Sequence, residues 1–80
     1  MDYKIICFGI AKDILGKREV ILSLPDNLTV AQFKQMIEER YPKLVGLASM
    51  KIAVNESYAS SDQLIQPTDE IVLIPPVSGG

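Results

Sequence analysis

The residues best suited to chemistry in this chain are its last six, Pro75 to Gly80, which directly follow the apolar run Ile71-Val72-Leu73-Ile74. No ionisable side chain occurs from Ile71 to Gly80, so the only charge expected there at neutral pH is the terminal carboxylate. A carboxylate at a bare chain end is a group that another protein can activate and convert into an acyl donor. The sequence therefore directs attention to Gly80.

The residue types before Gly80 would hold this carboxylate away from the body. Pro75 and Pro76 fix φ and remove two backbone N–H donors, so the chain must leave a sheet and run extended. Gly79 and Gly80 carry no side chain, which lets the end pass through a slot that a Cβ would block. At ~3.3 Å per residue the segment reaches roughly 20 Å. We expect one domain over 1–74 and a flexible, extended Gly-Gly tail over 75–80, rather than an ordinary frayed terminus.

Composition favours a single small domain. Apolar residues make up 48 % of the 80 residues, which is ample for one core but not for a core and an internal catalytic cavity. A single cysteine excludes an internal disulfide, so a reducing, cytoplasmic setting is expected. No apolar run approaches the ~20 residues of a membrane span and no signal peptide is evident, so no membrane association is expected.

Charge and residue types also limit which partners, ligands and catalytic roles are expected. The net charge is −2, and the eight basic residues form no cluster, so a protein partner is expected and a nucleic-acid partner is not. The chain has no histidine and no metal-ligand spacing, so we expect no metal, no bound cofactor and no independent catalysis. Cys7 is flanked by Ile6 and Phe8 and is interpreted as a buried packing residue rather than a nucleophile.

The first part of the chain is typical of a hairpin. Residues 3–8 are mostly apolar on both faces and therefore predict a strand central in its sheet, which Gly9 ends. Residues 10–15 predict a short helical turn closed by Gly16. Residues 17–24 place apolar side chains at alternate positions, which predicts a half-exposed strand.

The second part contains the long helix. Thr29 and Gln32 have capping-box spacing, and apolar residues then recur at helical spacing until Pro42 stops the helix. A loop follows. Residues 50–54 predict a strand, 55–57 a turn, 58–59 a short return strand and 71–74 a strand covered on both faces.

This order of elements predicts the fold class. A hairpin, a crossing helix and a final apolar strand give an α+β fold, with a mixed sheet of four to five strands and one main helix packed on it. The first and last strands, both apolar throughout, should lie side by side in the middle. This arrangement is the ubiquitin-like β-grasp.

With this fold in place, the closing string Asp69-Glu70-Ile71-Val72-Leu73-Ile74-Pro75-Pro76-Val77-Ser78-Gly79-Gly80 resembles the end of the MoaD family, the small subunits of molybdopterin synthase. That pattern has an Asp-Glu pair, an apolar strand, Pro-Pro-Val, Ser or Thr, and Gly-Gly. Val54-Asn55 before a turn, and Phe8 followed by a small residue and a short helix, also resemble the family. The resemblance extends over essentially the whole chain.

The resemblance implies a sulfur carrier. An E1-like adenylating enzyme of the MoeB type would use ATP to adenylate Gly80, and sulfur would then replace AMP to give a thiocarboxylate. The tail would enter a large subunit of the MoaE type, which supplies the catalytic groups, and pass sulfur to cyclic pyranopterin monophosphate. Two carriers would deliver the two dithiolene sulfurs within a heterotetramer, and the small subunit alone would have no activity.

The resemblance also implies roles for single residues. Gly80 would carry the reacting carbon, and the tail residues inserted into the partner would be Pro75, Pro76, Val77, Ser78 and Gly79. The partner interface would contain Phe8, Tyr58 and Ile74, for which ordinary core positions are the alternative.

Other functions stay open at this point. A thiamine-type sulfur carrier shares the Gly-Gly end but usually lacks the Pro-Pro-Val-Ser lead. A ubiquitin-like protein modifier would join Gly80 to lysines of other proteins. A passive β-grasp interaction domain is disfavoured by the composition of the tail, and an independent enzyme is the least favoured.

Overall fold

The computed structural model describes residues 1–47 and 50–75. Its elements, in chain order, are β1 (Asp2–Cys7), α1 (Gly9–Leu15), β2 (Glu19–Ser23), α2 (Val30–Arg40), the 3-10 helix η1 (Pro42–Gly46), β3 (Lys51–Val54), β4 (Ser57–Tyr58) and β5 (Ile71–Ile74). The strands form one mixed sheet in the order β2-β1-β5-β3-β4. The predicted ubiquitin-like β-grasp is confirmed.

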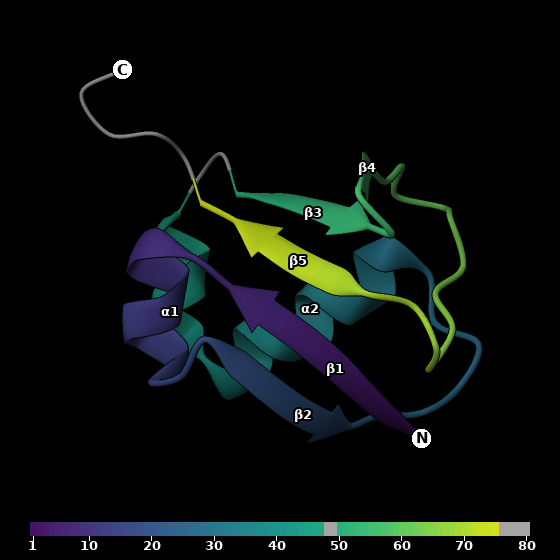
Figure 1. Cartoon of the computed structure of the whole chain (residues 1–80), viewed down its shortest axis with the longest axis horizontal. Helices are drawn as coiled ribbons and strands as arrows, with labels where there is room; N and C mark the ends of the chain where they lie inside the picture. Colours follow the sequence, from purple (N-terminus) through teal and green to yellow (C-terminus); the bar gives the residue numbers. More distant parts are fainter. Residues whose placement is uncertain (48–49, 76–80) are drawn as a thin grey trace.

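The strands nearest the two chain ends are neighbours in the centre of the sheet, as the sequence predicts (Figure 1). β1 and β5 run parallel, with Ile5 opposite Ile71 and Cys7 opposite Leu73. The other strand pairs are antiparallel. β5 ends at Ile74, and the next residue, Pro75, has no N–H to continue the ladder.

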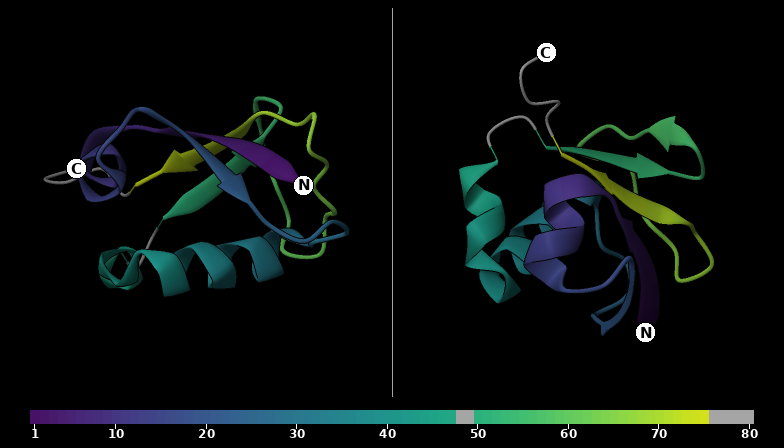
Figure 2. Two further views of the ribbon diagram at one scale, coloured as in Figure 1. Left: turned by 90° about the horizontal axis from the view of Figure 1, so that it is seen from below. Right: turned by 60° about the vertical axis from the view of Figure 1, so that its left-hand side comes forward.

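The long helix α2 covers one face of this sheet (Figure 2, left). The predicted capping box is present: the Gln32 N–H donates to Thr29 Oγ1 at 3.2 Å, and the Thr29 N–H donates to Gln32 Oε1 at 2.9 Å. Phe33 and Ile37 are fully buried between the helix and the sheet. Burial of this apolar side of α2 is what a helix of 11 residues needs in order to be stable.

The opposite face of the sheet, called the open face below, is not covered by any described element (Figure 2). In β1, buried residues alternate with the exposed Lys4 and the half-buried Ile6. In β5, Val72 and Ile74 are only half-buried. The prediction that residues 71–74 form a strand covered on both faces is therefore wrong, whereas the predicted central position of the first strand is confirmed. The one long helix covers a single face, so apolar residues on the other face remain partly exposed.

Two shorter helices complete the described structure. α1 forms where a helical turn is predicted and ends at Gly16, whose φ of 85° is in the left-handed region that favours glycine. η1 was not predicted: the sequence indicates a loop after Pro42, whereas this proline begins a 3-10 turn, a position that needs no N–H donor. None of the helices in residues 1–47 and 50–75 has the length and apolar character needed to cross a bilayer.

Candidate functional site

The point where the chain leaves the sheet lies beside the end of β1. Gly9 has φ +54°, a left-handed conformation that side chains other than glycine rarely adopt. A Cβ at Gly9 would lie 3.4 Å from Cγ of Pro75, so glycine also lets the two segments approach closely. We call Phe8, Gly9, Ile74 and Pro75 the tail root. Of the predicted tail residues, only Pro75 is among the described ones; Pro76, Val77, Ser78, Gly79 and Gly80 lie outside them.

The three predicted interface residues are on or beside the open face. The exposed fractions are 44 % for Phe8 and 72 % for Tyr58, and Ile74 is half-buried. These values exclude an ordinary core position for Phe8 and Tyr58. Tyr58 pairs with Ala53, which pairs with Val72 of β5, so Tyr58 and the outer side chains of β5 belong to one face. Their contact with a partner stays a prediction.

Phe8 is held at the tail root by Arg18, the residue that precedes β2. The Arg18 guanidinium carbon lies 5.5 Å from the centroid of the Phe8 ring, within the range of a cation–π contact. The Cys7 N–H donates to the Arg18 carbonyl at 2.7 Å, which fixes the backbone of the two segments against each other. Phe8 therefore presents a positioned aromatic surface next to Pro75.

A shallow groove of about 310 Å³ runs along the open face from β4 to the end of β5. Its lining residues are Ala53, Glu56, Tyr58, Glu70, Val72 and Ile74. Of these six residues, Tyr58 and Ile74 are predicted interface residues, and the other four are not. The alternation within Ile71–Ile74 is the signal that could have found Val72, because it places Val72 and Ile74 on the same side.

A cluster of hydrogen bonds holds the β3–β4 turn against the start of β5. The Asn55 N–H donates to the Glu70 carbonyl, and the Glu70 N–H donates to Asn55 Oδ1, each at 2.9 Å. Asn55 Nδ2 also donates to Asp69 Oδ1 at 2.9 Å, while Asp69 Oδ2 accepts from the Gln66 N–H at 2.7 Å. Asp69 thus organises the turn by hydrogen bonding, and the side chain of its neighbour Glu70 is left to line the groove.

Cys7 lies on the covered face of the sheet, away from the groove. Its side chain is fully buried, and burial raises the pKa of the Cys7 thiol to about 11. A thiol nucleophile needs a lowered pKa, so the interpretation of Cys7 as a packing residue is confirmed. Within residues 1–47 and 50–75, no three potential metal ligands come together.

Fold and site together define a class: ubiquitin-like β-grasp proteins in which the last described strand, β5, borders an open sheet face and is followed in the sequence by Pro-Pro-Val-Ser-Gly-Gly. Solved structures agree on the fold. SAMP1 from Haloferax volcanii superposes with a TM-score of 0.82 at 21 % identity, and each chain is covered completely. A complex of subunits 1 and 2 of molybdopterin-converting factor from Helicobacter pylori contains a chain with a TM-score of 0.67 at 21 % identity, again with complete coverage of both chains.

Proteins with similar sequences identify the family within this class. The ThiS family profile matches residues 5–80. The molybdopterin synthase sulfur carrier subunit of Dictyostelium discoideum is 37 % identical over 99 % of this chain and 96 % of its own length. The human protein of the same name is 37 % identical over 96 % of this chain and 92 % of its own length. The chain belongs to the ThiS family and, within it, to the family of molybdopterin synthase sulfur carrier subunits, which confirms the resemblance found in the sequence.

Proposed function

We propose that this chain is a sulfur-carrying small subunit of molybdopterin synthase and that Gly80 is the residue that carries sulfur. The observation that supports this most strongly is the similarity to molybdopterin synthase sulfur carrier subunits, which covers 99 % of this chain for the Dictyostelium discoideum relative. The ThiS family profile also includes the whole closing string, since it matches residues 5–80. The geometry is compatible with it, because β5 leads into Pro75 beside an exposed aromatic residue, Phe8, and the open face. The thiamine-type alternative is less well supported, since the named relatives are molybdopterin synthase subunits.

On this chain, the proposed chemistry is confined to the terminal carboxyl group of Gly80. A carboxylate oxygen attacks the α-phosphate of ATP on an E1-like partner of the MoeB type, and pyrophosphate leaves. Sulfur at the sulfide oxidation level, from a donor held by that partner, then attacks the acyl carbon and AMP leaves, which gives a thiocarboxylate. The sulfur passes to cyclic pyranopterin monophosphate on the large subunit, and water restores the carboxylate. The small subunit carries sulfur and supplies no catalytic side chain.

The proposed acceptor complex contains a large subunit of the MoaE type. The Helicobacter pylori structure, a complex of subunits 1 and 2, shows that a chain of this fold assembles with a second subunit in that protein. We propose that Phe8, Tyr58 and Ile74 contact the large subunit while Pro75, Pro76, Val77, Ser78 and Gly79 enter it. Two copies of each subunit would form a heterotetramer in the cytoplasm. A channel that excludes water would protect and position the thiocarboxylate.

Intact mass spectrometry tests the proposal directly. The purified chain is incubated with the activating enzyme of the same organism, ATP and a sulfide source. We expect the mass to increase by the replacement of one oxygen by one sulfur, located at Gly80 by fragmentation. Adducts between Gly80 and lysines of other proteins would instead favour a protein modifier. An unchanged mass under these conditions would overturn the proposal.

Deletion of Gly79 and Gly80 separates the proposed site from the fold. The described core ends before Pro76, so the truncated chain should keep the thermal transition of the full chain. It should gain no sulfur and support no molybdopterin formation when combined with the large subunit. Loss of the thermal transition would show that the last two residues are structural.

A further inference from the structure

The groove on the open face combines an apolar floor with an acidic rim. Ala53, Val72 and Ile74 form the floor, Tyr58 contributes an exposed aromatic ring, and the carboxylates come from Glu56 and Glu70. The two glutamates are brought together by the Asn55 hydrogen bonds to the Glu70 backbone. Both glutamates are exposed, so their charged groups are available to a partner.

Glu56 occupies a backbone position that glycine would normally fill. Asn55 and Glu56 are the two turn residues between β3 and β4, with φ of 52° and 70°. A two-residue hairpin turn with both φ values positive favours Asn followed by Gly. A glutamate with positive φ is strained relative to glycine. Among the described residues, no contact of Glu56 explains why a strained residue occupies this position. We therefore consider a role for its carboxylate.

Neither Glu56 nor Glu70 forms an ion pair with another described residue. Within residues 1–47 and 50–75 the one ion pair joins Lys4 to Glu19, at 3.7 Å on the other side of the open face. The nearest basic residue by register is Lys51, opposite Ile74; it lines a neighbouring hollow with Tyr58 but does not line the groove itself. The groove is therefore acidic near the β3–β4 turn, whereas basic side chains lie toward the tail root, where Arg18 packs on Phe8.

From these observations we infer that the groove receives an arginine side chain of the large subunit, an inference that rests on the proposed function. The guanidinium would pair with Glu56 and Glu70 and lie against the ring of Tyr58, while the aliphatic part of the side chain would cover Val72 and Ile74. Arginine suits this site because its planar, weakly hydrated group can pair with carboxylates and stack on an aromatic ring at once. This contact would fix the orientation of the carrier as its tail enters the large subunit.

The test measures the affinity of the full chain for the purified large subunit of the same organism by calorimetry. Glu56→Gln and Glu70→Gln should each raise Kd roughly fivefold at low salt, and the difference should shrink as salt is added. Glu56→Gly should raise Kd by a similar factor while raising Tm by a few degrees, because it removes the carboxylate and relieves the backbone strain. If Glu56 had only a structural role, the Glu56→Gly variant would not combine weaker binding with higher stability.

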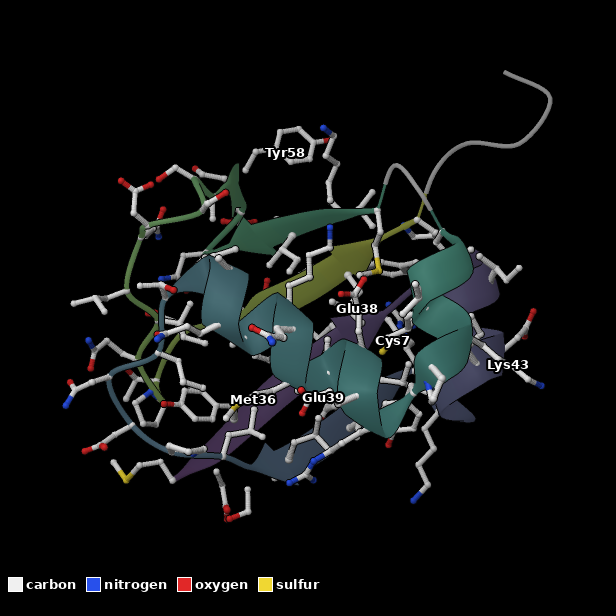
Figure 3. The ribbon with its side chains drawn as sticks, turned by 180° about the vertical axis from the view of Figure 1, so that it is seen from behind. Cys7, Met36, Glu38, Glu39, Lys43 and Tyr58 are labelled. Carbon is white, nitrogen blue, oxygen red and sulfur yellow. The ribbon has the colours of Figure 1, made fainter. Side chains whose placement is uncertain are left out.

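Glu39→Gln is the matched control. Glu39 is an exposed glutamate on α2, on the far side of the molecule from the open face (Figure 3), and its replacement should leave Kd unchanged. If the wild-type chain binds the large subunit and the Glu56 and Glu70 variants bind equally well, the inference is overturned while sulfur loading at Gly80 still supports the proposed function. Variants that lose affinity only for the activating enzyme would also overturn it. Failure of the wild-type chain to bind the large subunit would overturn the inference together with the proposed assembly.

Discussion

The two faces of the sheet are built from the same strands but have different partners. On the covered face, Tyr3, Ile5 and Cys7 of β1 are fully buried against the rest of the core, which includes Phe33 of α2. On the open face, Tyr58 is largely exposed and the outer side chains of β5 are only half-buried. Apolar side chains on the covered face are buried within the chain, whereas those on the open face remain partly or largely exposed.

We therefore expect apolar residues on the two faces to serve two purposes, stability and binding, that can be separated experimentally. Substitutions on the covered face should lower the free energy of unfolding. Substitutions on the open face should lower affinity for a partner and leave that free energy almost unchanged. Two substitutions, Phe33→Ala and Tyr58→Ala, and a pH titration of Cys7 test this separation, in order of their expected effect on stability.

Phe33→Ala should produce the largest loss. The Phe33 side chain is fully buried between α2 and the sheet, so its removal leaves a cavity that the surrounding residues can fill only in part. We expect the free energy of unfolding to fall by about 3–5 kcal/mol, measured by denaturant titration. A loss below about 1 kcal/mol would show that packing of α2 on this face is not what stabilises the domain.

Raising the pH should produce a smaller loss through Cys7. Burial raises the pKa of the folded-state thiol from 9.0 to about 11, so the folded state holds the proton more tightly than the unfolded state. The resulting stability is fully present below the unfolded-state pKa and is lost as the pH rises through the folded-state value. Between pH 9.0 and about 11 the free energy of unfolding should fall by roughly 2 kcal/mol because of this group.

Cys7→Ala is the control for that titration. The variant is less stable at neutral pH because it loses buried volume, but its free energy of unfolding should decline less steeply over the same pH range. Thermal unfolding at several pH values gives both curves. Parallel curves for the two proteins would show that the Cys7 thiol does not contribute to the pH dependence.

Much of the fold can be predicted from the sequence because its signals are local. The capping box at Thr29 and Gln32 and the helical spacing after it locate α2, and the structure contains both reciprocal hydrogen bonds. The apolar runs at the two ends predict adjacent central strands, which β1 and β5 form. Burial on both faces could not be inferred from these runs. The sequence pattern of an apolar strand is the same whether the strand is covered by a helix of the same chain or by a partner protein.

The candidate site was predicted only in part. Phe8, Tyr58 and Ile74 came from the family resemblance, and their position on or beside the open face depends on strand register. The groove and its acidic rim were missed because Glu56 and Glu70 are 14 residues apart, joined through hydrogen bonds of Asn55. A turn dipeptide of Asn followed by Glu gives one usable signal, since the second residue would normally be glycine.

Tyr58→Ala should have the smallest effect on stability and yet a clear effect on binding. The side chain is 72 % exposed on a two-residue edge strand, so its removal should change the free energy of unfolding by less than about 0.5 kcal/mol. Exposed aromatic residues are frequent energetic centres of interfaces, and we expect about a tenfold rise in Kd for the large subunit.

Ile21→Ala is the matched control: Ile21 is an apolar residue of the open face, 62 % exposed, but lies on β2 at the opposite edge of the sheet. Equal losses of affinity in the two variants would mean that the whole open face, rather than its β4–β5 side, contacts the partner. An unchanged Kd for Tyr58→Ala would show that Tyr58 does not contribute to the interface. Phe8 and Ile74 would then be the remaining candidates for contact with the large subunit.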